Sequence, residues 1–171
     1  MRQAAAETGF AGAPIGGRGA GARSRRSTGS NGGIVNRWIR GLGGDAAPLS
    51  ASMLIPRLKA GLSVGELDAL RGGLDLPMER LAPMLGISKA TLHRRKASGR
   101  LDTAESDRVV RFARLLGRAA SVMESLEAGR RWLTSPQVGF GGEIPLVYAE
   151  TEVGAREVED LLGRIEHGVY S

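Results

Sequence analysis

The fold of this chain is expected to form around the stretch LAPMLGISKATLHRRKA, residues 81–97. Four apolar side chains recur at a spacing that lets two short helices share one buried seam: Leu81, Leu85, Ile87 and Leu92. Gly86 allows the chain to turn between these helices. Ser88 stands at an N-cap position, where its hydroxyl can accept a hydrogen bond from a backbone N–H of the second helix. The stretch therefore predicts a helix, a tight turn and a second helix.

The second of these helices is strongly basic. Residues 77–100 contain six basic side chains and one acidic side chain. A helix-turn-helix inserts such a helix into the DNA major groove with its N-terminal residues at the base edges, while flanking cations neutralise phosphates. We therefore expect a DNA-binding surface made of Ser88, Lys89, Thr91, Arg94, Arg95 and Lys96. The better candidates for reading bases are Ser88, Lys89, Thr91 and Arg94.

An alternative interpretation of this stretch stays open. Short helical hairpins with a glycine turn also occur in proteins that never bind DNA, and their basic face is then simply solvated. In addition, Arg95 occupies a position where DNA-reading motifs often have an aliphatic residue. The charge is what favours the helix-turn-helix.

Two further helices are expected before the hairpin, at residues 50–60 and 63–70. Ser63 followed by Glu66 is the pattern of a capping box. Pro77 suits the first position of the helix that leads into the hairpin, because that position needs no backbone N–H. One domain is thus expected to form around the hairpin.

The N-terminal part of the chain is expected to lie outside that domain. Residues 1–33 are rich in Gly, Ala, Ser and Arg and have almost nothing to bury, so a disordered basic tail is predicted. The short stretch around Trp38 is interpreted as a docking turn. We divide the chain into a disordered or linker segment, a DNA-binding and dimerisation domain, and a C-terminal domain: residues 1–49, 50–125 and 126–171.

A long helix is expected to begin near residue 102, with Asp102 or Thr103 as its cap and Glu105 three positions after Asp102. Its main apolar stripe would pack against the hairpin. Four more apolar residues lie partly off that stripe: Val110, Leu115, Val122 and Leu126. This excess indicates either a homodimer contact or a larger core. A dimer would suit a helix-turn-helix, because two recognition helices can read two half-sites about one helical turn apart.

The C-terminal region is expected to be helical and acidic. A short helix at residues 128–134 is followed by SPQVGFGG at 135–142, whose proline and glycines exclude regular structure. Thr151 would cap a final helix with one apolar stripe: Val158, Leu161, Leu162, Ile165 and Val169. The whole chain has a net charge of +6, yet residues 151–171 contain five acids and two bases. An all-α protein with a basic centre and an acidic end indicates two different partners.

The composition excludes several classes of function. The chain has no cysteine, which removes disulfides, thiolate catalysis and thiolate-bound zinc. Its two histidines, His93 and His167, are too far apart to form a local metal motif. No constellation of side chains indicates catalysis, so we expect no enzyme, no metal and no cofactor. No apolar run approaches the roughly 20 residues of a membrane helix, so we expect a cytoplasmic protein that binds no membrane.

Several motifs resemble one family, the antitoxins of the Xre, MbcA and ParS type, which are partners of RES-domain toxins. The resemblance covers about residues 50–171, and its most specific part is C-terminal. The matching motifs are TLHRR at 91–95, ESDR at 105–108, RWLTSP at 131–136, TEVGAREV at 151–158 and LLGRIEHGVYS at 161–171.

This resemblance implies an autorepressor that also neutralises a toxin. RES toxins of this family resemble ADP-ribosyltransferases and degrade NAD, and the C-terminal end of the antitoxin blocks entry to their active site. The implied toxin-binding residues are Arg156, Leu161, Leu162, Ile165, His167, Gly168, Val169, Tyr170 and Ser171. The implied partners are a RES-domain toxin, operator DNA and a second copy of the chain.

Two alternatives to this function remain. The apolar stripe of the final helix can instead close the protein's own core. The residues considered without the family resemblance would favour this interpretation. The chain can also be a stand-alone transcription regulator whose acidic end serves dimerisation or binds a small effector. A neighbouring gene for a RES-type toxin would favour the antitoxin.

Overall fold

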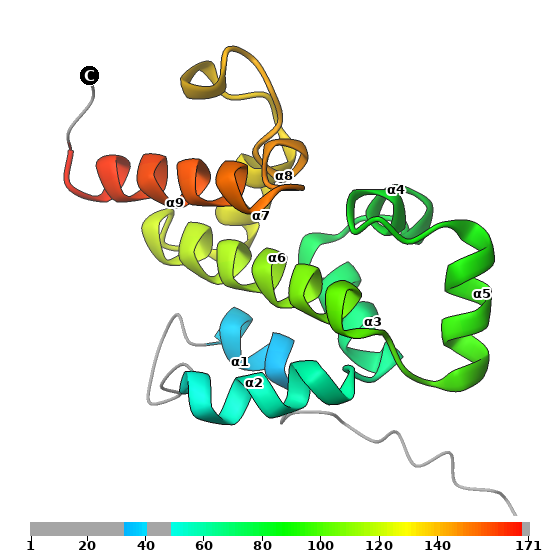
Figure 1. Ribbon diagram of the computed structural model, residues 1–171. Coiled ribbons are helices and arrows are strands. Elements are labelled where there is room, and N and C mark those ends of the chain that lie inside the picture. The colour runs from blue at the N-terminus through cyan, green and yellow to red at the C-terminus, as the bar shows by residue number, and fades with distance from the viewer. Residues whose placement is uncertain (1–32, 41–48, 169–171) are drawn as a thin grey trace, which may run out of the picture.

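The computed structural model describes residues 33–40 and 49–168. These residues form nine α-helices and one short 3-10 helix, η1, and contain no β-strand (Figure 1). The elements are α1 (Ile34–Arg40), α2 (Ala51–Ala60), α3 (Val64–Leu74), α4 (Met78–Met84), α5 (Lys89–Ser98), α6 (Thr103–Val122), α7 (Leu126–Thr134), η1 (Val138–Phe140), α8 (Pro145–Tyr148) and α9 (Glu152–Glu166). The all-α prediction is confirmed. None of the described helices has the length and apolar character needed to cross a membrane.

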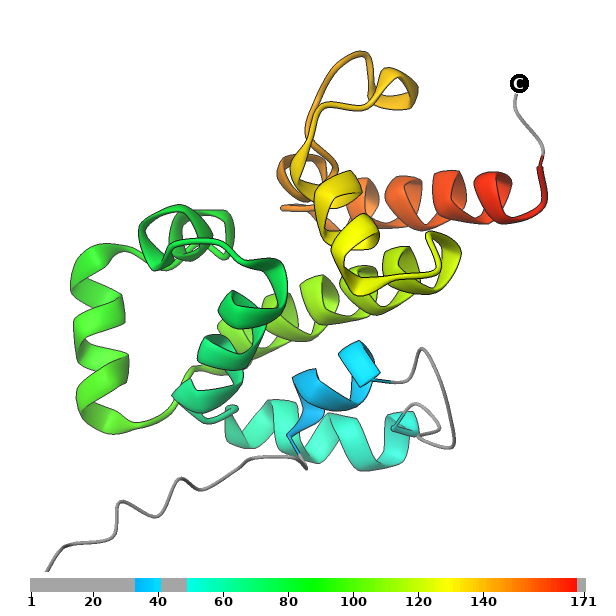
Figure 2. The ribbon, with the colours of Figure 1, turned by 180° about the vertical axis from the view of Figure 1, so that it is seen from behind.

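Helix α6 is the centre of the fold, and α1, α3, α7 and α9 all pack against it (Figures 1 and 2). One continuous core runs from α1 to α9. Val110 and Leu115 are buried in this core, while Val122 and Leu126 are partly buried against it. A larger core therefore accounts for the apolar residues that we weighed as a dimer contact.

Helix α1 belongs to this core, which corrects the expected boundary at residue 50. Ile34 and Val35 are buried. The carbonyl oxygen of Trp38 lies so close to Gly117 of α6 that a Cβ on this glycine would be 2.5 Å away. The stretch around Trp38 is therefore a packed helix rather than a docking turn. The disordered tail predicted for residues 1–33 falls, apart from Gly33, outside the described residues.

Glu66 caps α1 rather than its own helix. Its two carboxylate oxygens accept hydrogen bonds from the backbone N–H groups of Ile34 and Val35, both at 2.9 Å. The side chain of Ser63 makes no capping bond at the start of α3, so the predicted capping box was wrong. The first N–H groups of any helix lack partners within it, and a carboxylate suits their partial positive charge. Glu66 thus ties α1 to α3.

Three other predicted helix starts are confirmed. Ser88 Oγ accepts a hydrogen bond from the Thr91 N–H at 3.1 Å, and Thr151 Oγ1 accepts one from the Gly154 N–H at 3.1 Å. At the start of α6, Asp102 and Glu105 form a reciprocal capping box, with both hydrogen bonds at 2.8 Å. The loop at 135–142 contains one 3-10 turn, η1, where no regular structure was expected.

Candidate functional surfaces

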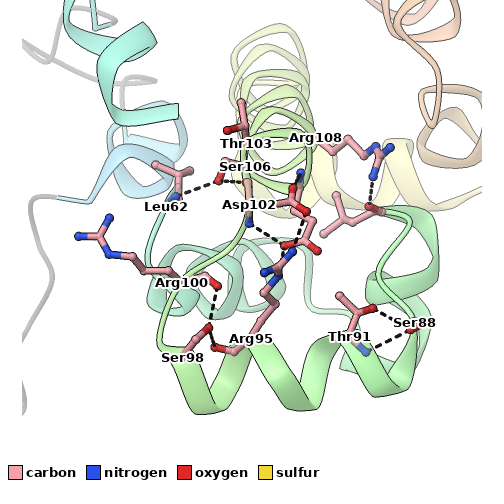
Figure 3. A network of polar contacts seen from close by, with 12 residues as sticks. Leu62, Ser88, Thr91, Arg95, Ser98, Arg100, Asp102, Thr103, Ser106 and Arg108 are labelled. Atoms are coloured by element: carbon pink, nitrogen blue, oxygen red, sulfur yellow. Dashed lines mark hydrogen bonds and ion pairs between the residues drawn. The ribbon is translucent and has the colours of Figure 1, made fainter. Parts of the chain in front are cut away.

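The turn between α4 and α5 is fastened to α6. Gly86 adopts a left-handed φ of +67°, which glycine reaches without strain. The Arg108 guanidinium of α6 donates a hydrogen bond to the carbonyl oxygen of Leu85 at 3.0 Å (Figure 3). Leu81 and Ile87 are buried at either side of this turn. The angle at which α5 leaves the body is therefore set by the turn and by α6 together.

Helix α5 buries none of its side chains completely, and one of its faces is open to solvent. The exposed residues of the helix are Lys89, Ala90, His93, Arg94, Lys96, Ala97 and Ser98. At its start, the Ser88 hydroxyl donates to Thr91 Oγ1 at 3.0 Å (Figure 3). Four of the six expected DNA-binding residues are thus exposed, and Thr91 is partly buried beside Ser88.

Ala90 and His93 are outward-facing residues that the sequence reasoning missed. Ala90 lies three positions before His93 and four before Arg94, and residues three and four apart share a helix face. Leu92 is partly buried. Helical spacing counted back from Arg94 would have identified Ala90.

Arg95 is turned inward, which corrects its expected place on the DNA-binding surface. Its Nε donates to Glu105 Oε2 at 2.8 Å, and its NH2 group donates to Asp102 Oδ2 at 2.7 Å (Figure 3). The Arg95 side chain is 20% exposed and that of Glu105 is 6% exposed. Arg95 fills the position of the usual aliphatic residue because two carboxylates at the start of α6 neutralise it there. The residue connects α5 to α6.

The contacts of Arg95 shift its own pKa and that of Asp102. The hydrogen bond that Arg95 donates to Glu105 raises the pKa of Arg95 above its ordinary value. Burial by itself would raise the pKa of Asp102, but the Glu105 backbone N–H and the Arg95 charge outweigh it and lower that pKa below its ordinary value. Both groups therefore stay charged at neutral pH.

Helix α9 presents a different kind of surface. Its buried side chains are Ala155, Val158 and Leu162, so Leu162 closes the protein's own core and is inaccessible to a partner. Leu161 and Ile165 are partly buried, while Arg156 and His167 are exposed. The six expected toxin-binding residues that the structure describes thus divide into one core residue and five with exposed surface, Gly168 included. The alternative interpretation was that the apolar stripe of this helix closes the protein's own core. This interpretation is correct for Val158 and Leu162.

Three ion pairs, which we call the α6–α9 ladder, border this apolar seam. Arg111 Nε lies 3.0 Å from Glu152 Oε2, and Arg114 Nε lies 2.6 Å from Glu159 Oε1. The third pair is bidentate and joins Arg118 to Glu166. The residue numbers rise together on both helices, so α9 runs parallel to α6. Burial by itself would raise the pKa of Glu152, but a hydrogen bond from Arg156 and the charge of Arg111 lower it.

Gly168, the last described residue of those expected to bind a toxin, lies at the far end of this seam. Gly168 adopts a φ of +67° directly after α9, as expected for a glycine that ends a helix. Val169, Tyr170 and Ser171 lie outside the described residues.

Comparison with known proteins connects these two surfaces to two domains. Residues 53–114 match the model of the antitoxin Xre-like helix-turn-helix domain, and residues 118–168 match the antitoxin Xre/MbcA/ParS C-terminal toxin-binding domain. The two matches meet within α6. An antitoxin Xre from Yersinia enterocolitica is 35% identical over 123 residues, which cover 70% of this chain and 82% of the relative.

Two further relatives are more distant. An antitoxin Xre from Photorhabdus laumondii is 30% identical over 116 residues, 67% of this chain and 78% of its own. A Prs ADP-ribosylating antitoxin from Sphingobium is 25% identical over 126 residues, again 67% of this chain and 78% of its own.

Proposed function

The chain belongs to the Xre/MbcA/ParS antitoxin family, and we propose that its toxin is a RES-domain protein that degrades NAD. In this proposal the C-terminal end of the chain occludes the toxin's active site. The chain also represses its own operon through DNA binding. Membership of an antitoxin family with a helix-turn-helix fits a regulator rather than an enzyme.

One observation carries the proposal: the two surfaces lie at opposite ends of α6. Helix α5 adjoins the start of α6 through Arg95 and Asp102, whereas Glu166 is paired with Arg118 near the other end. Figure 1 shows α5 and the end of α9 on opposite sides of the molecule. A helix of 20 residues is about 30 Å long. This separation leaves room for DNA and a toxin to be bound at the same time.

The toxin-binding part of the proposal involves residues of α9 and the residues that follow it. Arg156, His167 and Gly168 are exposed, and Leu161 and Ile165 keep part of their surface open. We assign the toxin contact to these residues and to Val169, Tyr170 and Ser171, and the exposed acids of α9 would complement the cationic lining of a pocket for a phosphate-rich dinucleotide. The name of the Sphingobium relative refers to ADP-ribosylation, a reaction that consumes NAD.

The DNA-binding part involves the outward face of α5. We assign phosphate and base contacts to Ser88, Lys89, Thr91, Arg94 and Lys96, and we leave out Arg95 because its guanidinium is bound to Asp102 and Glu105. A homodimer would present two α5 helices to two half-sites about one helical turn apart. This geometry supports repression at a palindromic operator.

The first experiment co-expresses the chain with the product of the neighbouring gene. We expect the two proteins to co-purify and cellular NAD to be preserved, whereas the toxin expressed by itself depletes NAD. Deleting residues 168–171 should leave folding intact and abolish neutralisation, because α9 and its buried side chains remain. Full protection by the truncated chain would refute occlusion by the C-terminal end.

DNA binding is tested separately, on the promoter fragment of the operon. Arg94→Ala should weaken binding by about 10- to 100-fold, as expected for the loss of one specific contact. Arg131→Ala, on exposed α7 surface, is the matched control and should leave binding unchanged. A stand-alone regulator would bind this fragment equally well, yet it would not co-purify with the neighbouring gene product.

A further inference from the structure

Exposed apolar side chains gather on one part of the C-terminal domain. Among the described residues, six large apolar side chains are exposed, and four of them lie between residues 138 and 153: Val138, Val147, Tyr148 and Val153. Val138 is 97% exposed and Val153 is 74% exposed. An apolar side chain that stays in contact with water does not contribute the favourable free energy of its burial. A concentration of them marks a surface that a partner covers.

The loop that carries Val138 is held in one shape by its own backbone. The Gln137 N–H donates to the Glu143 carbonyl oxygen, and the Gly142 N–H donates to the Gln137 carbonyl oxygen, both at 3.0 Å. The Gln137 side-chain amide also donates to the Trp132 carbonyl oxygen at 2.9 Å. The loop therefore projects Val138 into solvent in a defined position. A side chain that is already in place loses little entropy when a partner binds it.

Aromatic rings and α9 support this loop from below. The Phe140 ring lies 4.9 Å from the Tyr148 ring and 6.4 Å from the Trp132 ring, measured between centroids. A Cβ on Gly139 would lie 2.6 Å from a methyl carbon of Leu161 in α9. Figures 1 and 2 show the loop with η1 on the side of α9 that faces away from α6. The loop backbone at Gly139 therefore packs against the partly buried Leu161.

We propose that Val138, Val147, Tyr148 and Val153, which we name the docking patch, anchor the toxin independently of the C-terminal residues that reach its active site. This inference rests on the proposed toxin partnership. The patch lies within the match to a toxin-binding domain, whereas the other two exposed apolar residues, Met53 and Ile55, lie in α2.

The chemistry of the patch also indicates the surface that it contacts. Exposed acidic side chains occur in the same stretch of sequence and just after it, namely Glu143, Glu150 and Glu157. Exposed apolar side chains with acids near them in the chain would be complementary to a toxin surface with an apolar hollow and a basic border. The patch supplies affinity, while the C-terminal residues supply inhibition.

The test measures the binding of the purified toxin encoded by the neighbouring gene to the full chain. The double variant Val138→Asp/Val153→Asp should lose about 100-fold in affinity, as expected when two anchor residues are removed. Both side chains are exposed, and an acid in the first turn of α9 suits the helix dipole, so the fold should persist. Val138→Asp by itself should weaken binding in the same direction. Met53→Asp/Ile55→Asp is the matched control and should bind like wild type.

The deletion of residues 168–171 separates anchoring from inhibition. It should keep toxin binding within about tenfold of wild type while losing inhibition of NAD consumption. Wild-type affinity of the Val138→Asp/Val153→Asp variant would overturn the docking patch and leave the proposed function standing. If the wild-type chain does not bind the toxin at all, the proposed function fails and the docking patch fails with it.

Discussion

Helices α5 and α9 are both attached to α6, but by different means. Helix α5 buries no side chain completely and is held mainly by the Arg95 ion pairs, the partly buried Leu92 and its turn. Helix α9 buries Ala155, Val158 and Leu162, and its ion pairs border that seam. In the proposed function α5 must keep its outer face free for DNA, and polar bonds at one edge hold it. A helix that carries a protein-binding surface can be fastened by an apolar stripe.

The largest expected effect tests the apolar attachment of α9. Leu162→Ala should lower the free energy of unfolding by about 2–5 kcal/mol, because Leu162 is fully buried and the change leaves a cavity. Leu92→Ala in α5 should cost less, since Leu92 is only partly buried. Denaturant unfolding of both variants measures the difference. Equal losses would show that α5 depends on apolar packing as much as α9 does.

The next effect tests the polar attachment of α5. Arg95→Met should leave the buried Glu105 carboxylate without its cation, lower the Tm and weaken operator binding by about tenfold, although Arg95 faces away from the DNA-binding surface. Arg95→Met/Glu105→Gln removes the unpaired charge and should recover most of the Tm. If Arg95→Met abolishes binding with an unchanged Tm, Arg95 contacts DNA directly.

A smaller effect concerns pH. The pKa values of Asp102 at the start of α6 and Glu152 at the start of α9 are both lowered in the folded chain. A carboxylate whose pKa is lowered by folding stabilises the fold at pH values above its ordinary pKa. This contribution is lost as the pH falls through the pKa that the group has in the folded chain. Asp102→Asn keeps an N-cap side chain but does not titrate there. Its Tm should therefore approach that of wild type as the pH falls below about 4.

The same pH measurement compares the attachment of α5, which involves Asp102, with that of α9, which involves Glu152. Glu152→Gln, at the start of α9, should show the same convergence at low pH, measured by thermal unfolding between about pH 3 and 7. A constant difference in Tm across this range would contradict the lowered pKa values.

The smallest effect concerns the α6–α9 ladder. Glu166→Gln should change the free energy of unfolding by at most about 0.5 kcal/mol, because the pair is partly solvated and screened by salt. The same variant in high salt should be indistinguishable from wild type. A loss as large as that of Leu162→Ala would mean that ion pairs, rather than the apolar seam, hold α9.

The sequence was sufficient for the local features of this fold. The caps at Ser88, Asp102 and Thr151 were predicted because each depends on residues within three positions. The hairpin seam at Leu81, Leu85 and Ile87 follows from helical spacing, and all three residues are buried. Helix α1 was missed because seven residues carry too little periodicity to predict a helix. Its stability comes from packing on α6 and from Glu66.

The candidate surfaces, like the fold, were predicted from the sequence only in part. Charge identified α5, and the resemblance of the C-terminal motifs identified α9, both directly from sequence. Neither could show that Arg95 turns inward, that Leu162 is core, or that Val138 is exposed on a rigid loop.

The sequence by itself thus determined most of the helices, most of their caps and the antitoxin family, since these depend on neighbouring residues and on motif order. The tertiary structure decided which face of each helix is free. That choice depends on contacts between residues far apart in the chain, such as Glu66 with Ile34 and Arg114 with Glu159. Apolar and charged side chains can each serve a core or a partner, and only packing distinguishes the two.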